Sequence, residues 1–136
     1  MSHLHLRVDI GEEHYAVPVD HVQEVTRIGD LTPVPGAESP ILGATNLRGE
    51  VLPIVDLAAM LGVGVEADPD QIVVTEFGAL RAGMAVGKVV GVSEMAAPDI
   101  PTDAPMLHGA VLVDGALIGV LDIAGALEAL AAKGRT

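Results

Sequence analysis

The sequence contains no cysteine and almost no aromatic residues: of Phe, Tyr and Trp, its 136 residues include only Tyr15 and Phe77. Without cysteine the chain forms no disulfide bond, no thiolate zinc site and no cysteine nucleophile. Proteins that bind single-stranded nucleic acid stack the bases on aromatic side chains, which this chain supplies at two positions only. These shortages exclude several classes of site before any motif is considered.

Positive charge is also scarce, because 7 Lys and Arg residues stand against 19 Asp and Glu residues, for a net charge of -12. Binding to a phosphate backbone depends on clustered cations that displace counterions, and the basic residues here are scattered. The sequence therefore predicts no nucleic-acid partner. Its acidity favours solubility and attraction to a basic surface, without identifying that surface.

Long hydrophobic runs are missing as well. The longest stretch without a charged residue is the ten residues 104–113, whereas a membrane-spanning helix needs roughly 18 or more. The first five residues, MSHLH, contain no basic region leading into an apolar stretch, so we expect no signal peptide. We therefore expect a cytoplasmic location without direct insertion into a membrane.

What the chain does have is apolar content, at 50% of its residues, in short runs separated by glycine and proline. A chain of this length is typical of one domain with a substantial core. Leu4, Leu6, Val8 and Ile10 alternate with polar residues, which predicts a strand with one buried face. The four prolines and glycines of residues 33–40 exclude a helix interior there.

Two apolar stretches, 41–47 and 51–55, are joined by Arg48-Gly49-Glu50, which predicts a β-hairpin with glycine in the turn. Asp56 follows as a predicted helix cap, before apolar residues spaced for one helical turn. The same order returns near the C-terminus, where Asp122 is expected to cap a helix with one apolar face.

This recurrence is an internal repeat. An offset of 66 residues places Gly43 on Gly109 and Asp56 on Asp122, and an offset of 67 places Val22 on Val89. We therefore predict an all-β fold of two small barrels packed together, with a short C-terminal helix covering one end. We expect a single domain over residues 4–133, with its two similar halves at roughly 4–66 and 67–133.

Residues for catalysis or for cofactor binding are not evident. His3, His5 and His14 could approach one metal ion, but their spacing matches no zinc site, and a solvated strand face is the preferred interpretation. The sequence has no G-x-S-x-G turn and no glycine-rich phosphate loop. We predict a protein that is not an enzyme and that has no metal and no cofactor.

Two segments carry residues that a small barrel does not require. Asn46 to Gly49 place the cation Arg48 at a hairpin tip, where the repeat has Asp114 instead. An arginine at a tip is either simply solvated or an anchor of a protein interface, and both interpretations remain open at this point. In the second segment, residues 22–25, the valines are spaced to enter the core and Glu24 is expected to be exposed.

The segment that contains this tip, residues 43–57 (GATNLRGEVLPIVDL), resembles the central signature of the CheW-like domain family. Residues 15–25, the TPVP segment at 32–35 and the closing IGVLDI at 118–123 are similar to the same family. The resemblance covers nearly the whole chain. It implies two five-stranded SH3-like β-barrels around a shared core, in agreement with the internal repeat.

The resemblance also implies a function. CheW-like proteins are non-catalytic adaptors that couple methyl-accepting chemoreceptors to the histidine autokinase CheA in bacterial chemotaxis. The receptor's cytoplasmic signalling tip is expected in a groove between the barrels, and the regulatory domain of CheA at one barrel end. The alternatives are a CheW-like module of another two-component signalling array, or a small β-barrel that binds a metabolite. The expected partner-binding residues, all matched to the family's motifs, are Val22, Glu24, Val25, Gly43, Asn46, Leu47, Arg48 and Gly49.

Overall fold

The computed structural model describes residues 2–65 and 69–133, which form ten strands, two α-helices and one short 3-10 helix. Alternating or continuous apolar residues build each strand, and glycine, proline or charged residues separate them. The elements of the first half are β1 (Ser2–Ile10), β2 (Glu13–Pro18), η1 (Val19–His21), β3 (Val22–Arg27), β4 (Ile41–Leu47), β5 (Glu50–Asp56) and α1 (Leu57–Leu61). Those of the second half are β6 (Gln71–Phe77), β7 (Leu80–Val86), β8 (Lys88–Ala96), β9 (Leu107–Val113), β10 (Ala116–Leu121) and α2 (Ile123–Lys133).

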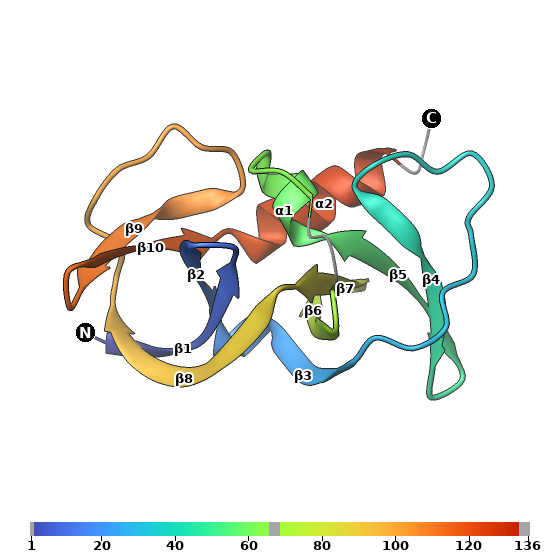
Figure 1. Cartoon of the computed structure of the whole chain (residues 1–136), viewed down its shortest axis with the longest axis horizontal. Coiled ribbons are helices and arrows are strands. Elements are labelled where there is room, and N and C mark those ends of the chain that lie inside the picture. The colour runs from blue at the N-terminus through green and yellow to red at the C-terminus, as the bar shows by residue number, and fades with distance from the viewer. Residues whose placement is uncertain (1, 66–68, 134–136) are drawn as a thin grey trace.

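The strands form two five-stranded sheets, in the orders β8-β1-β2-β10-β9 and β3-β6-β7-β5-β4. Both sheets are strongly curved and lie side by side, and we call them the first and the second barrel (Figure 1). The predicted all-β fold with two five-stranded SH3-like barrels is confirmed. The predicted C-terminal helix is also confirmed, as α2.

The internal repeat is visible in the backbone. The hairpin β4–β5 holds the same place in the second barrel as β9–β10 holds in the first. Arg48 and Gly49 have φ values of 51° and 86°, and Asp114 and Gly115 have 48° and 81°. Two consecutive residues with positive φ are typical of the tight turns that match the twist of a hairpin. The offset of 66 residues thus relates two hairpins of the same construction.

The barrels do not follow the expected division into residues 4–66 and 67–133. The first barrel takes β1 and β2 from the first half and β8, β9 and β10 from the second. The second barrel takes β3, β4 and β5 from the first half and β6 and β7 from the second. Each half therefore gives its first hairpin to the barrel that the other half completes. The expected boundary separates the two sequence repeats, but it cuts through both barrels.

Two parallel strand pairings, β2 with β10 and β7 with β5, stabilise this exchange of hairpins, because each joins strands from different halves of the chain. The central strands β2 and β7 are buried on both faces. Tyr15 and Met84 face a core cluster that both barrels share, whereas Ala16 and Ala85 face the interior of their own barrel. Alternate side chains of one strand thus serve two cores, which holds the barrels together.

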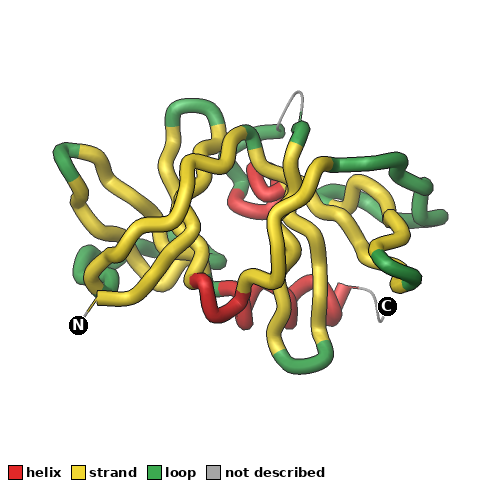
Figure 2. The backbone as a smooth tube through the Cα atoms, turned by 90° about the horizontal axis from the view of Figure 1, so that it is seen from below, coloured by secondary structure: helices red, strands yellow, loops and turns green. Residues whose placement is uncertain are grey.

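Two short helices complete the shared core. Figure 2 shows α1 and the start of α2 at the junction of the two groups of strands. Asp56 caps α1 by accepting a hydrogen bond from the Ala58 amide at 3.0 Å, and Asp122 accepts one from the Gly125 amide at 3.0 Å. Both predicted caps are therefore confirmed. Among the described residues, no helix has the length and apolar character needed to cross a membrane.

Candidate partner-binding site

An open hollow of about 560 Å³ lies on the second barrel, where the edge strand β3 approaches the tip of the hairpin β4–β5. Two arginines and three glutamates surround it, so its lining is mainly polar. Because these charges come from four strands and one turn, the barrel's closure is what brings them together. The lining residues are Val22, Gln23, Glu24, Leu47, Arg48, Glu50, Glu76 and Arg81.

Arg48 stands at the tip because the turn holds it there. Its φ of 51° places it in the left-handed region, and Gly49 follows with a φ of 86°. The Asn46 side chain accepts a hydrogen bond from the Gly49 amide at 2.9 Å, which closes the turn. The Asn46-Leu47-Arg48-Gly49 sequence therefore has a local structural reason, and it presents the Arg48 side chain at 75% exposure.

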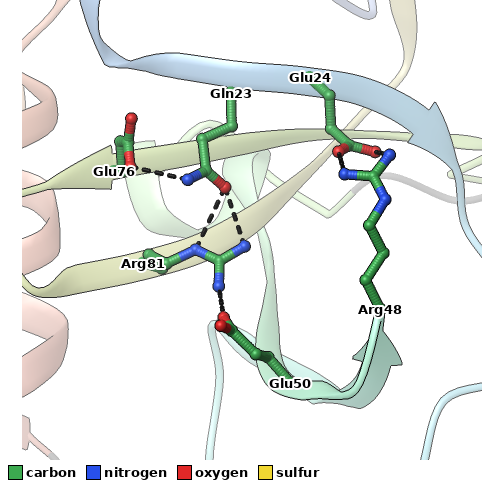
Figure 3. A network of polar contacts seen from close by, with 6 residues as sticks. All are labelled: Gln23, Glu24, Arg48, Glu50, Glu76 and Arg81. Carbon is green, nitrogen blue, oxygen red and sulfur yellow. Dashed lines mark hydrogen bonds and ion pairs between the residues drawn. The ribbon is translucent and has the colours of Figure 1, made fainter.

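The guanidinium of Arg48 forms a two-point ion pair with Glu24 of β3: Nη1 donates to Oε2, and Nη2 donates to Oε1 at 3.2 Å. Figure 3 shows the two side chains facing each other. Glu24 is the more enclosed partner, at 21% exposure against 75% for Arg48. β3 and β4 are the two edges of this sheet, so the pair joins its ends. Arg48 is therefore not a freely solvated cation. A partner that binds it meets a guanidinium that is already paired with Glu24.

A second polar network lies beside this pair. Arg81 of β7 donates to the Gln23 side-chain oxygen from Nε at 3.2 Å and from Nη2 at 2.8 Å, and from Nη1 to Glu50. The Gln23 amide in turn donates to Glu76 at 2.7 Å, so the network spans four strands (Figure 3). We call these four residues the Arg81 network.

Sequence reasoning missed the Arg81 network. Arg81 and Gln23 are 58 positions apart. Gln23 lies in the segment 22–25 singled out from the sequence, but Arg81 lies in none of the recognised motifs. The available signal was the repeat: an offset of 67 places Glu76 and Arg81 on Asp9 and His14. Asp9 and His14 form their own contact in the first barrel, with Nδ1 of His14 at 2.7 Å from Oδ1 of Asp9.

The edge strand β3 contains a bulge at Gln23, because the pairing with β6 shifts between Val22 and Glu24. A bulge leaves one residue outside the ladder and redirects its side chain. Here the redirected side chain is that of Gln23, which reaches Arg81. The same irregularity occurs in the first barrel, where the ladder between β1 and β8 shifts beside Val90.

The predicted binding residues fall into two groups. Glu24, Leu47 and Arg48 line the hollow together with Val22, and Asn46 and Gly49 form the adjoining turn. The other two expected residues, Val25 and Gly43, do not line it: Val25 is half-buried and packs against the shared core. Gly43 is buried on β4, where a Cβ atom would lie 2.9 Å from the Thr32 carbonyl oxygen. The structure thus gives Val25 and Gly43 packing positions.

His3 is exposed on β1, as the expectation of a solvated strand face has it, whereas His5 differs from that expectation. His5 is only 4% exposed, and its Nδ1 donates to the His3 carbonyl oxygen at 3.0 Å. The His14 ring contacts Asp9 instead of turning toward a common centre. Among residues 2–65 and 69–133, no group of three or more His, Asp or Glu side chains is arranged to hold a metal ion.

The group with a clear pKa shift lies away from the hollow. Tyr15 of β2 is 5% exposed, and its hydroxyl donates to Glu13. Burial, the hydrogen bond to the Glu13 carboxylate and that group's negative charge raise the pKa of Tyr15 well above its ordinary value. Tyr15 therefore stays a neutral hydrogen-bond donor at physiological pH, which suits a core residue better than an acid–base catalyst.

Comparison with known proteins identifies the family to which this fold belongs. The model of the CheW-like domain matches residues 5–131. The chain belongs to the CheW-like domain family. A curated relative, Chemotaxis protein CheW of Thermotoga maritima, is 31% identical over 135 residues, which cover 94% of this chain and 89% of the relative.

Other members of the CheW-like family are similar at comparable levels. Protein FrzA of Myxococcus xanthus is 36% identical over 123 residues, covering 89% of this chain and 75% of FrzA. A crystal structure of the scaffolding protein TtCheW from Thermoanaerobacter tengcongensis superposes with a TM-score of 0.80 at 24% identity, covering 90% of this chain and 86% of the other. This superposition supports the two-barrel fold.

Proposed function

We propose that this chain is a non-catalytic scaffold that couples chemoreceptors to the histidine autokinase CheA in chemotaxis. Membership of the CheW-like family and similarity to relatives named Chemotaxis protein CheW support this assignment. The observation that carries the proposal is the hollow on the second barrel, where the family's signature turn is joined to β3 by the pair Arg48–Glu24.

In this proposal the regulatory domain of CheA binds at the hollow, against Val22, Glu24, Leu47 and Arg48. The turn residues Asn46 and Gly49 fix the position of Arg48, while Val25 and Gly43 support the two strands from behind. Arginine is the cationic side chain most enriched at the energetic centres of protein interfaces. A neighbouring carboxylate that orients its guanidinium reduces the entropy lost on binding.

The receptor's cytoplasmic signalling tip is a helical hairpin and needs an apolar groove. A groove of about 160 Å³ lies between the helices at the junction of the barrels, lined by Met60 of α1, Met106, and Ala126 and Leu130 of α2, among others. Methionine side chains adapt to the shape of an inserted helix. Two partners on different surfaces are what an adaptor requires, and such an adaptor would lie in the cytoplasm at membrane-associated receptor arrays.

The test is formation of a complex between this chain, a receptor signalling-tip fragment and the regulatory domain of CheA, measured by analytical ultracentrifugation. We expect the wild-type chain to bind both partners. We expect Arg48→Glu to weaken kinase-domain binding by about 2–5 kcal/mol, because it removes donors and places a carboxylate beside Glu24. Lys88→Glu is the matched control: Lys88 is an exposed cation at the start of β8 in the other barrel.

Normal kinase-domain binding by Arg48→Glu would exclude Arg48 from the interface. Failure of the wild-type chain to bind either partner would contradict the proposed function as a whole. The match to the CheW-like domain identifies the family and not the signalling array, so a CheW-like module of another array is the second candidate. Binding to the receptor and kinase of such an array, but not to chemotaxis partners, would favour it.

A further inference from the structure

We infer that Arg81 is a positioning residue of the proposed kinase-binding site, which fixes β3 and the hairpin β4–β5 in one arrangement. The effect on partner binding rests on the proposed function, whereas the effect on local order does not. Arg81 acts through its neighbours: Gln23 directly precedes Glu24 in β3, and Glu50 lies two residues after Arg48. Holding Gln23 and Glu50 therefore sets the distance between the two residues of the exposed ion pair.

The geometry of Arg81 suits a residue that connects Gln23 and Glu50 rigidly, and we call Arg81 the connector. A guanidinium has five N–H donors in a fixed plane, and Arg81 directs three of its nitrogens at two acceptors on either side of it. The Arg81 side chain is 26% exposed, whereas its partner Glu50 is 66% exposed. The connector is thus more enclosed than the hairpin residue that it holds. Hydrogen bonds to charged groups contribute more than neutral ones, and they contribute most where water is partly excluded.

The fold itself does not require this network. In the first barrel the repeat places Val90 where the second has Gln23, and Ala116 where the second has Glu50. Gly91 and Asp114 replace the ion pair of Glu24 and Arg48, and a glycine has no side chain that could form such a pair. The first barrel nevertheless has the same strand order and the same β-bulge. The first barrel keeps a polar contact between Asp9 and His14, the counterparts of Glu76 and Arg81, but it closes without counterparts of the Gln23, Glu50 and Glu24–Arg48 contacts. This difference favours a role for those contacts at the binding surface.

The bulge explains how Arg81 can hold the edge strand β3 through the Gln23 side chain. Gln23 lies outside the regular ladder, and β3 is an edge strand with β6 as its single neighbour in the sheet. Irregular edge segments lose order more easily than central strands. The contacts of Gln23 with Arg81 and Glu76 replace the ordering that a second neighbouring strand would give.

The first test needs no partner. We would measure amide hydrogen exchange and thermal unfolding of the whole chain for Arg81→Met, which keeps the apolar stem but removes every donor. We expect exchange at residues 22–25 and 46–50 to become about tenfold faster, because Arg81→Met removes the three hydrogen bonds that Arg81 donates to Gln23 and Glu50. The melting temperature should change little, because the barrel cores are untouched. The matched control is Arg27→Met, at the exposed far end of β3, which should change neither segment.

The second test measures binding of the CheA regulatory domain by isothermal titration calorimetry. We expect Arg81→Met to weaken binding about tenfold, and Gln23→Ala combined with Arg81→Met to be no weaker than the stronger single effect, because both act through one network. Arg81→Lys should not restore full affinity, since an ammonium group cannot bridge Gln23 and Glu50 as a planar fork does.

The outcomes separate the two proposals. Unchanged exchange in Arg81→Met overturns the positioning role, whatever the partner does. If Arg81→Met or Arg81→Lys binds the CheA regulatory domain with wild-type affinity, the inferred effect of Arg81 on partner binding is overturned. If the wild-type chain binds no kinase domain while Arg81→Met shows faster exchange at both segments, the proposed function fails. The role of Arg81 in positioning β3 and the hairpin β4–β5 is then still supported.

Discussion

At the scale of single residues, the most informative feature is that Arg48 already has a partner within the chain. An exposed ion pair of this kind contributes about 0.2–1 kcal/mol to folding, because solvent screens it and side-chain entropy opposes it. Because the pair contributes little to stability, its effect on binding can be measured in variants that still fold. A partner that contacts Arg48 must either accept the paired arrangement or replace Glu24.

Reversing both charges separates these roles. In the double variant Glu24→Arg with Arg48→Glu, we expect thermal stability to return to within about 0.5 kcal/mol of the wild type, because a pair forms again in the opposite sense. We expect kinase-domain binding to stay weak, because the partner then meets reversed charges. Thermal unfolding and calorimetric titration measure the two effects. Full binding by the double variant would mean that the pair acts only by holding the turn.

At the scale of elements, the two repeated hairpins depend on a glycine at the same position of their first strand. Gly43 of β4 and Gly109 of β9 lie against the connecting segments at Thr32 and Ile100, each with a backbone hydrogen-bonded bridge to the following alanine. A Cβ atom at either glycine would lie 2.9 Å from a backbone carbonyl oxygen. Backbone atoms cannot yield as a flexible side chain can, so the close approach requires glycine.

We therefore expect Gly43→Ala and Gly109→Ala to lower the free energy of unfolding by similar amounts, about 1–3 kcal/mol each. Denaturant titration followed by circular dichroism measures this change. The matched control is Gly29→Ala, because a Cβ atom at Gly29 would meet no other atom within 4 Å. Gly29→Ala should be neutral or slightly stabilising, because alanine restricts the unfolded chain more than glycine does. A loss at Gly29 as large as at Gly43 would contradict the close approach as the cause.

At the scale of the whole molecule, the exchange of hairpins makes each half of the chain insufficient by itself. A fragment of residues 1–66 contains three strands of the second barrel and two of the first, and a fragment of residues 67–136 contains the complement. We expect each fragment alone to show no cooperative thermal transition, and an equimolar mixture to recover one. Circular dichroism and one-dimensional NMR measure this. Cooperative unfolding of either fragment alone would contradict the dependence on exchange.

The sequence by itself determined what depends on neighbouring residues. The alternating apolar positions predicted the strands, and Asp56 and Asp122 predicted the caps of both helices. The glycines spaced 66 residues apart predicted two equivalent hairpins. The signature around Arg48 identified the family, which the match over residues 5–131 confirmed. Each of these signals reflects backbone geometry or local hydrogen bonding, which acts over a few residues.

Only the tertiary structure decided which strands share a barrel and which charges meet. A repeat indicates that two segments are equivalent, but a hairpin makes the same local contacts whether it completes its own half or the other one. The pairing of β2 with β10 therefore could not be deduced from the pattern. Glu24 with Arg48, and Arg81 with Gln23, are brought together by barrel closure across 24 and 58 positions. Contacts at such separations leave no periodic pattern in one sequence, because they depend on how the whole chain closes.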